Sequence, residues 1–466
     1  MTAGRGSRVA VALAAMVLAG CNEGGSGSGS GSTTTTVSAS GTNVAAVTAG
    51  FGALGPSGGY ANGIWTSVIV CVPGSTTECD TIPDVLVDTG SVGLRVLSSA
   101  LTVSLPGVTD SSGNVLQECI QFADLSYMWG PVATARIGFT GTGETALQVP
   151  GQAANSGVPI QIIAASPSAT VPSSCLAAPA TPGMTVDRNT LESLGGNGIL
   201  GVGTIPQDCG EACATASYYQ YYICPNNECS VPNVPVARQV WNPVAALSSS
   251  DNNGVLITLP AVAAGGALSA TGSLIFGIGT QSNNGIGAAQ VYETDGYGNF
   301  PKVVLNGATY ASPNNGSYID SGSTDIFFSD AHSLASTGIV ECSGNLAGYY
   351  CPASVIPFTT TVFGANNVSG PVQFNIANAL SLFSTGYGAF NDVGGDSGTG
   401  PSTDDVDLGL PFFLGRSVYV GIAGSNATYP NGYWAFQGAG AASSTAAVST
   451  ETGIAIGPPK TPVGVR

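Results

Sequence analysis

Short apolar runs, each ended by a cluster of Gly, Pro, Ser, Thr or Asp, recur along most of the 466-residue chain. No long stretch repeats its apolar positions at helical spacing, and Val, Ile, Thr and Ser occur throughout. Such runs are typical of β-strands separated by turns. Residues 65–72 and 84–87 are two examples, and Pro73 and Gly74 begin the turn region between them. The pattern predicts an all-β protein.

Two of the apolar runs end in nearly the same turn. Residues 85–87 lead into Asp88 and a Thr-Gly-Ser turn, and residues 318–319 lead into Asp320 and a Ser-Gly-Ser turn. A single turn of this kind is a common surface feature, but two matched copies in matched strand context are not. We therefore expect two related halves that each contribute one buried carboxylate.

The other residues of these turns suit such a site. A glycine lets two loops approach closely because it has no side chain. The hydroxyl that follows each aspartate can bond across to the opposing loop, and the serine that ends each turn can donate to the carboxylate. The supporting residues are therefore Thr89, Gly90, Ser91, Ser321, Gly322 and Ser323.

If the two loops face each other, Asp88 and Asp320 cannot both ionise easily and will share one proton. The ionised carboxylate then acts as a base on a water, while the protonated one polarises the carbonyl of a peptide bond. This chemistry needs neither a metal nor a cofactor, and it forms no acyl-enzyme. The pair is the signature of an aspartic peptidase.

Further motifs resemble those of the pepsin-like aspartic peptidases and follow in the same order. Residues 197–203 resemble the run that supports the first catalytic loop, 272–277 the strand near the junction of the lobes, and 410–419 the support of the second loop. The chain also resembles a bacterial lipoprotein branch of that family. The resemblance implies a bilobal fold with a cleft between two related lobes, which we place at 43–282 and 283–437.

The resemblance further implies a flap, a hairpin over the cleft with a tyrosine near its tip. The candidate is Tyr127, with Trp129 as its competitor, and the alternative is that both are core aromatics. Residues 205–245, rich in Cys and Tyr, depart from the family pattern. We interpret them as a surface excursion held by disulfides, and whether it binds a partner is left open.

The chain has eleven cysteines, and setting Cys21 aside leaves ten (11 − 1), an even number that is consistent with five disulfides. Disulfides of this kind form in an oxidising compartment. Connectivity cannot be read from spacing alone, so the pairs remain hypotheses: Cys71 with Cys79, Cys342 with Cys351, Cys119 with Cys175, and a nested set among Cys209, Cys213, Cys224 and Cys229.

Ten basic and 27 acidic residues give a formal net charge of −17. Nucleic acid is therefore excluded as a partner, because phosphate binding needs a basic face. A metal site is not predicted either, because the cysteine spacings are irregular and His332 is the sole histidine.

Both ends of the chain differ in composition from the middle. Residues 1–20 combine arginines with an apolar run too short for a membrane span, which predicts an export signal. Cys21 follows Leu-Ala-Gly, which resembles a bacterial lipobox and implies lipidation there; an ordinary secretory signal is the alternative. We expect a protein anchored in the bacterial cell envelope, at the outer membrane, with 21–42 as a flexible tether and 438–466 as a disordered tail.

Two functions follow from these observations. The leading hypothesis is a monomeric endopeptidase that acts on peptides or proteins. The second is a catalytically silent pepsin-like protein that binds or inhibits a partner at the envelope. The intact pair of aspartates argues against the second hypothesis, while the unusual flap and the Tyr-rich segment argue for it.

Overall fold

The computed structural model describes residues 34–437, apart from residue 59 and the segments 123–125, 166–168, 177–186, 216–217, 312–315, 330–336, 338 and 398–404. The described residues belong to one unit of the chain, Thr33–Arg466. The predicted export signal, Cys21, most of the tether, His332 and the tail lie outside the described residues, so the expectations about them stay predictions.

Strands make up most of the regular structure of the described residues, which confirms the all-β prediction. No helix among the described residues is long and apolar enough to cross a membrane. The helices are α1 (Leu191–Leu194), α2 (Glu211–Thr215), α4 (Ala379–Phe383) and α5 (Leu410–Phe413). The short 3-10 turns are η1 (Gly55–Gly58), η2 (Ser98–Ala100), η3 (Pro225–Asn227), η4 (Val236–Arg238), η5 (Pro243–Ala246) and η6 (Gly344–Leu346).

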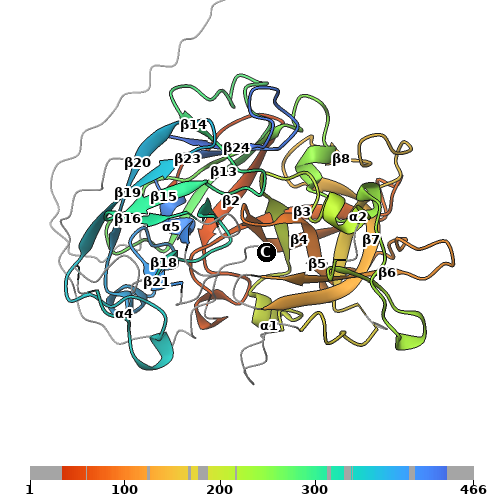
Figure 1. The fold of residues 1–466 in the computed structure, drawn as a ribbon, viewed down its shortest axis with the longest axis horizontal. Helices are drawn as coiled ribbons and strands as arrows, with labels where there is room; N and C mark the ends of the chain where they lie inside the picture. Colours follow the sequence, from red (N-terminus) through yellow and green to blue (C-terminus); the bar gives the residue numbers. More distant parts are fainter. Residues whose placement is uncertain are drawn as a thin grey trace, which may run out of the picture. The chain divides into compact units, whose positions relative to one another are not determined.

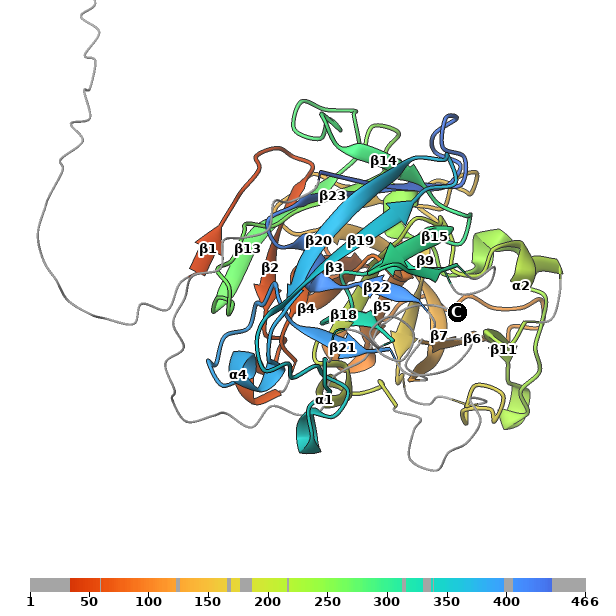
Figure 2. The same ribbon diagram turned by 60° about the vertical axis from the view of Figure 1, so that its left-hand side comes forward.

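The largest sheet in the described part of the chain has 16 strands and combines N-terminal with C-terminal segments (Figures 1 and 2). Its main path is β11 (Tyr221–Ile223), β6 (Leu116–Gln121), β7 (Tyr127–Phe139), β9 (Val158–Ile163), β5 (Val92–Leu97), β10 (Gly198–Val202), β4 (Cys79–Asp88), β3 (Gly63–Cys71), β2 (Val44–Gly50), β13 (Ser269–Phe276), β12 (Gly254–Thr258), β23 (Ser417–Gly421), β24 (Tyr433–Phe436) and β14 (Gln290–Glu293). The two strands off this path are β1 (Thr34–Thr36) and β8 (Thr145–Ala146).

Two smaller sheets, each of four strands, complete the described structure. Their strands, in order, are β16 (Ala308–Tyr310), β15 (Lys302–Leu305), β19 (Ile356–Phe363) and β20 (Ser369–Ile376), and then β17 (Tyr318–Ile319), β22 (Val406–Leu408), β18 (Ile326–Phe328) and β21 (Gly394–Asp396). Apolar residues of all three sheets belong to one core, which includes Val87 and Ile319, the residues directly before the two aspartates. Both turns are therefore attached to closely packed strands.

One arrangement of four strands occurs twice. In the first copy β10 lies between β4, to which it is parallel, and β5, to which it is antiparallel, and β5 pairs in parallel with β9. In the second copy β22 lies between β17, again parallel, and β18, again antiparallel, and β18 pairs in parallel with β21. The chain visits the four strands in the same order each time. The two aspartate turns therefore occupy equivalent places in two copies of one motif.

The strand register fixes which residues of the two copies correspond. Ile199 and Asp407 each lie in register with the residue two positions before the aspartate of their own copy. Across the next strand Ile199 pairs with Arg95, whereas Asp407 pairs with Phe327. The two copies thus share their backbone pairing but differ in the charged residues that they bury.

The five predicted disulfides are present in the described residues, and one detail of the prediction is wrong. The pairs Cys71–Cys79, Cys342–Cys351 and Cys119–Cys175 form as expected. The four remaining cysteines pair in sequence rather than as a nested set, Cys209 with Cys213 and Cys224 with Cys229. The physical reason is local: Gly210, with φ of 63°, turns the chain between Cys209 and the first residue of α2, and this brings Cys213 next to Cys209.

Residues 205–245 are only partly a surface excursion. Strand β11 within them pairs with β6 at the edge of the largest sheet. The side chains of Tyr221 and Tyr222 are buried, whereas Tyr218 and Tyr219 are exposed. The segment therefore adds to the core with one pair of tyrosines and presents the other pair to solvent.

Candidate active site

Each candidate aspartate lies against the glycine of the opposite turn. Asp88 is the last residue of β4, Asp320 directly follows β17, and both are completely buried. A Cβ atom built on Gly90 would lie 2.5 Å from Asp320 Cγ, and one built on Gly322 would lie 2.7 Å from Asp88 Cγ. Both separations are too short for real atoms, so only glycine leaves room for the opposing carboxyl group.

Two hydroxyl groups connect the turns reciprocally. The Thr89 amide donates to Ser321 Oγ (3.1 Å), and the Ser321 amide donates to Thr89 Oγ1 (3.0 Å). Each hydroxyl in turn donates to a backbone carbonyl of the opposing strand, Thr89 to Ile319 (3.0 Å) and Ser321 to Val87 (2.7 Å). These bonds are the cross-turn contacts that the sequence predicts, and they hold the two aspartates at a fixed separation.

The serine that ends each turn contacts its own aspartate, but the two turns then differ. Ser91 Oγ donates to Asp88 Oδ2. Ser323 Oγ lies 2.8 Å from Asp320 Oδ2 and also 2.5 Å from Oδ2 of Asp407, a buried residue of β22. The second turn therefore has an additional carboxyl group, which reaches Asp320 through one hydroxyl.

Burial and proximity raise the pKa values of both aspartates. Burial, followed by the charge of Asp320, raises the pKa of Asp88 well above its usual value. Burial also raises the pKa of Asp320, but hydrogen bonds oppose that rise. The Gly322 amide donates to Asp320 Oδ1 at 2.7 Å, and the Gly90 amide is shared between Asp88 Oδ1 (2.8 Å) and Asp320 Oδ1 (3.2 Å). Asp88 accepts two hydrogen bonds, from Gly90 and Ser91, whereas Asp320 accepts a third, from Ser323, in addition to those of the two amides. Because donors favour the ionised form, the shared proton belongs on Asp88 and the charge on Asp320.

Two residues that the sequence analysis did not single out connect the segment before β3 to the second turn. Tyr60 donates from its hydroxyl to the Gly322 carbonyl (3.2 Å). Asn62 donates from Nδ2 to the Thr324 carbonyl (2.8 Å) and accepts from the Phe390 amide (2.7 Å). The Asn62-Gly63 pair, with φ of 56° at Asn62, is a recognisable turn signal. Nothing in the sequence indicates what that side chain contacts.

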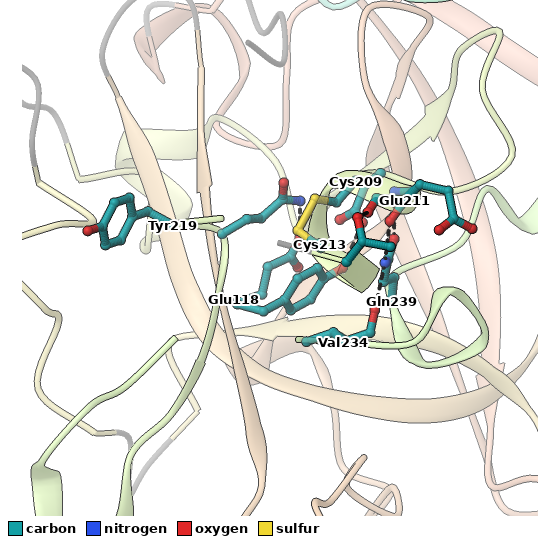
Figure 3. The surroundings of a disulfide bond; sticks show 12 residues. Glu118, Cys209, Glu211, Cys213, Tyr219, Val234 and Gln239 are labelled. Carbon is teal, nitrogen blue, oxygen red and sulfur yellow. Dashed lines mark hydrogen bonds between the residues drawn. A yellow bond between two sulfur atoms is a disulfide. The ribbon is translucent and has the colours of Figure 1, made fainter. Parts of the chain in front are cut away.

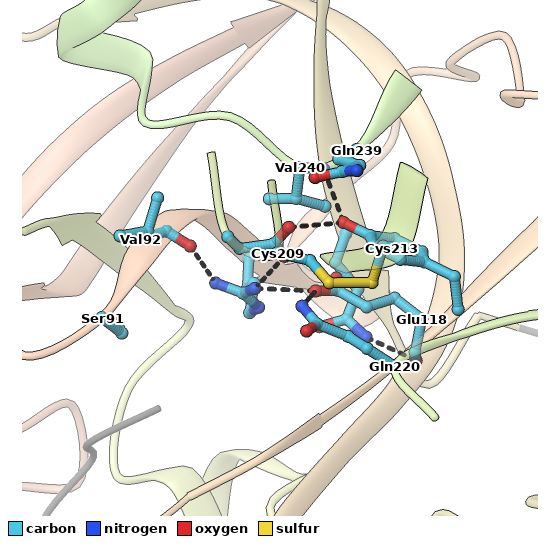
Figure 4. A network of polar contacts seen from close by, with 12 residues as sticks. Ser91, Val92, Glu118, Cys209, Cys213, Gln220, Gln239 and Val240 are labelled. Carbon is cyan, nitrogen blue, oxygen red and sulfur yellow. Dashed lines mark hydrogen bonds and ion pairs between the residues drawn. A yellow bond between two sulfur atoms is a disulfide. The ribbon is translucent and has the colours of Figure 1, made fainter. Parts of the chain in front are cut away.

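A buried ion-pair network lies behind the first turn. Arg95 Nη2 contacts Glu118 Oε1 (2.7 Å) and Asp208 Oδ2 (2.9 Å), and Arg95 Nη1 donates to the carbonyl of Val92, the residue after Ser91. Figure 4 shows this network between Val92 and Glu118, beside the Cys209–Cys213 disulfide. The network therefore supports the strand that leaves the first turn.

Hydrogen bonds also hold Asp208 and the neighbouring disulfide loop in place. Tyr221 donates from its hydroxyl to Asp208 Oδ1 (2.7 Å). Burial, followed by the charge of Glu118, raises the pKa of Asp208 well above its usual value, and Arg95 opposes that rise. Figure 3 shows Gln239 and Val234 beside the disulfide and Tyr219 pointing away from it. Gln239 bonds both backbone groups of Gly210, inside the disulfide loop (2.6 and 2.7 Å).

The two flap candidates, Tyr127 and Trp129, lie at the start of β7. Both are buried, and they belong to a cluster that includes the Cys119–Cys175 disulfide. The Trp129 indole donates to the Ala169 carbonyl (2.9 Å) and packs edge-on against Tyr222. These contacts give them the environment of core aromatics. Residues 123–125, between β6 and β7, lie outside the described residues, so the flap stays a prediction.

Among the described residues no group of three or more His, Cys, Asp or Glu side chains could hold a metal ion. A family model described as Protein of unknown function (DUF3443) matches residues 39–436, which include both aspartate turns. No curated protein matches the chain.

Proposed function

The chain belongs to this family of proteins of unknown function, and we propose that it is an aspartic endopeptidase that uses Asp88 and Asp320. One observation carries the proposal: two buried carboxyl groups, from two copies of one strand motif, each lie against the glycine of the opposite turn. Burying two adjacent carboxyl groups is unfavourable for stability. Strongly perturbed acids of this kind concentrate at functional sites.

The chemistry follows from which carboxyl group holds the proton. Asp320, ionised, takes a proton from a water whose oxygen attacks the carbonyl carbon of the peptide bond. Asp88 gives its proton to the carbonyl oxygen, and a tetrahedral diol forms. Asp320 then gives its proton to the amide nitrogen, the C–N bond breaks, and a diol hydroxyl returns a proton to Asp88. The site is then restored with one proton, and no covalent enzyme intermediate has formed.

A bilobal, pepsin-like arrangement is part of the proposal. The two copies of the four-strand motif support it, because one aspartate turn would then belong to each lobe. The strands β12, β13 and β2 connect the two regions in one sheet. Strands β14, β23 and β24 belong to 283–437 but pair within this sheet. The boundary at 282 therefore separates two parts of the sequence, while the backbone hydrogen bonds of one sheet continue across it.

The test is cleavage of an unfolded protein by the purified chain between about pH 3 and 7, with and without pepstatin, because acid–base catalysis by such a pair depends on pH. We expect cleavage that is favoured by acid, inhibited by pepstatin, and lost in both Asp88→Asn and Asp320→Asn. Absence of cleavage by a folded sample with all its disulfides would overturn the proposal. That result would favour the silent binding protein.

A further inference from the structure

The Ser323 hydroxyl lies between two carboxyl groups, and it cannot serve both as a donor. Its oxygen is 2.8 Å from Asp320 Oδ2 and 2.5 Å from Asp407 Oδ2, and all three side chains are buried. A serine hydroxyl carries one proton. If it donates to one carboxyl group, the short contact with the other requires that the other group carries a proton and donates it to Ser323. One of the two aspartates must therefore be neutral.

The remaining hydrogen bonds decide which one is neutral. Asp320 Oδ1 accepts from the Gly322 amide at 2.7 Å and from the Gly90 amide at 3.2 Å, and both bonds stabilise a negative charge. Asp407 Oδ1 is buried and has no hydrogen-bond partner among the described residues. An ionised carboxylate with an unpartnered buried oxygen is unfavourable. The proton is therefore on Asp407 and the charge on Asp320.

We propose that Asp407 is a positioning residue of the candidate site: its neutral carboxyl group donates to Ser323 Oγ and so directs the Ser323 proton onto Asp320. As a role in catalysis, this rests on the peptidase function proposed above. The site then holds two protons among three carboxyl groups, one on Asp88 and one on Asp407. A chain of hydrogen bonds that all point the same way strengthens each member, so Asp320 is kept ionised as the base.

The groups around Asp407 support a neutral form. Burial, followed by the charge of Asp320, raises its pKa well above the usual value, and Asp405 and Asp88 act in the same direction. On β17, Tyr318 lies in register with Asp407. Burial, followed by the charge of Asp407, raises the pKa of the Tyr318 phenol as well. The hydrogen bond between Ser323 and Asp407 opposes this rise in the pKa of Asp407. The charges that raise the pKa of Asp407 in this way, those of Asp320, Asp405 and Asp88, are all carboxylates.

The first copy of the motif has no counterpart of this relay. The residue equivalent to Asp407 is Ile199, and Ser91 Oγ donates to Asp88. This difference gives the two aspartates their unequal roles, because only Asp320 accepts a hydrogen bond from a hydroxyl group that another carboxyl group, that of Asp407, has oriented. When rising pH removes the proton of Asp407, two carboxylates compete for the Ser323 proton. Activity should then decline.

Two variants of Asp407 separate its effect on the orientation of the Ser323 hydroxyl from the effect of its charge. Asp407→Asn keeps a donor toward Ser323 but cannot ionise, so we expect activity within about twofold of the wild type in acid and an alkaline limit about one pH unit higher. Asp407→Leu has no donor and approximates the first copy, so we expect kcat about tenfold lower with KM within about twofold. If both variants keep the wild-type kcat and pH profile, Asp407 has no positioning role.

A third variant keeps the test decisive if Asp407→Leu does not fold. Ser323→Ala removes the hydroxyl through which Asp407 acts, so Asp407→Asn should no longer move the alkaline limit in that background. A shift of equal size with and without Ser323 would overturn the relay, because it would show that Asp407 acts by its charge alone.

Infrared spectroscopy tests the proton on Asp407 without relying on activity. Near neutral pH both the wild-type chain and Asp407→Asn should show the carbonyl bands of the buried, protonated Asp88 and Asp325, and the wild type should show one additional band that Asp407→Asn lacks. The matched control is Asp110→Asn, at a partly exposed residue where a hydrogen bond from Asn114 lowers the pKa of the carboxyl group, so its removal should leave this band unchanged. Identical carbonyl bands in the wild type and in Asp407→Asn would overturn the inference even if the chain is a peptidase. A band lost in that variant, from a chain that cleaves no peptide, would leave the proton assigned and refute the proposed function.

Discussion

The two copies of the four-strand motif have the same strand pairing but balance buried charge in different ways. In the first copy Arg95 offsets Glu118 and Asp208, and these are the two ion pairs within the described residues. The second copy buries Asp407 and Asp325 without an ion pair among those residues. A buried carboxyl group that has no cation and has one oxygen without a hydrogen-bond partner, as Asp407 and Asp325 have among the described residues, is stable only when it is protonated. The first copy therefore depends on an ion pair, and the second depends on protons.

This difference has a consequence for pH. The guanidinium of Arg95 stays charged at every pH that the protein will meet. The protons of the second copy are lost as pH rises, and its buried acids then become unpaired charges. The second copy should consequently be the part of the site that limits the protein in alkali, although the two turns look alike in sequence.

The largest expected effect is the loss of the ion-pair network. Arg95→Met keeps most of the side-chain volume but leaves Glu118 and Asp208 buried without their cation, which should lower the free energy of unfolding by about 3–5 kcal/mol near neutral pH. Denaturant unfolding measures it. The loss should be smaller in acid, where the two carboxyl groups can be protonated.

The matched control for Arg95→Met is Arg238→Gln, at a partly exposed arginine of η4. It should change the free energy of unfolding by less than about 0.5 kcal/mol. An equally small effect of Arg95→Met would mean that the first copy does not depend on its cation, and the comparison between the copies would fail.

The next largest effect concerns the glycine that each aspartate turn contains. Gly90→Ala and Gly322→Ala would each place a methyl group within 2.7 Å of a carboxyl carbon of the opposite turn. Displacement of the carboxyl groups should lower kcat/KM by about 100-fold in both variants, because small misplacements of catalytic groups cost about that much. Gly285→Ala, at a glycine with open space around it, is the control and should retain activity. A loss in only one turn would contradict the equivalence of the two turns.

The third prediction concerns the protons of the second copy. Burial raises the pKa of Asp325 to about 8, and its Oδ2 has no hydrogen-bond partner among the described residues. The folded chain therefore keeps a proton on Asp325 that the unfolded chain loses at a lower pH. Stability should be highest below the unfolded pKa and should fall as pH rises toward about 8, by up to about 1.4 kcal/mol per pH unit.

Asp325→Asn cannot lose this proton, so its unfolding temperature should fall less than that of the wild type between pH 5 and pH 8. Thermal unfolding at both pH values measures the difference. Asp110→Asn, in the exposed loop before β6, should leave the pH dependence of the wild type unchanged in this range. Parallel pH curves for the wild type and Asp325→Asn would show that Asp325 is ionised in the fold.

The sequence predicts the parts of the site that are local along the chain. Each aspartate turn carries its apolar strand, its glycine and its hydroxyls within a few residues, and two copies make the pattern specific. The all-β class follows in the same way from short runs and turn residues. The adjacent cysteine pairs are local too, and the nested alternative failed because it disregarded the turn at Gly210 that brings Cys209 next to Cys213.

The rest of the site depends on pairings between distant strands. Asp407 is 84 positions from Ser323, and only the insertion of β22 between β17 and β18 brings them together. Asp208 is 113 positions from Arg95. In the sequence Asp407 is one acid among several near residue 405, and its apolar equivalent, Ile199, becomes recognisable only through the strand register. A pattern of single residues contains no information about such contacts.

The smallest expected effect tests how the segment before β3 supports the second turn. Tyr60→Phe removes the hydroxyl that donates to the Gly322 carbonyl but keeps the ring, which packs edge-on against Trp65. Loss of one buried hydrogen bond should lower the free energy of unfolding by about 1 kcal/mol. Because Gly322 leaves room for Asp88, we also expect kcat to fall by a few fold with little change in KM.

The control for this substitution is Tyr297→Phe, at a tyrosine that is 76% exposed, and it should change neither quantity. The two measurements have separate meanings. A change in stability alone would make Tyr60 a structural contact of the fold. A change in kcat as well would show that the position of the second turn, and not only its presence, determines the rate. If neither changes, the second turn is held by Asn62 and the Thr89–Ser321 bonds without help from Tyr60.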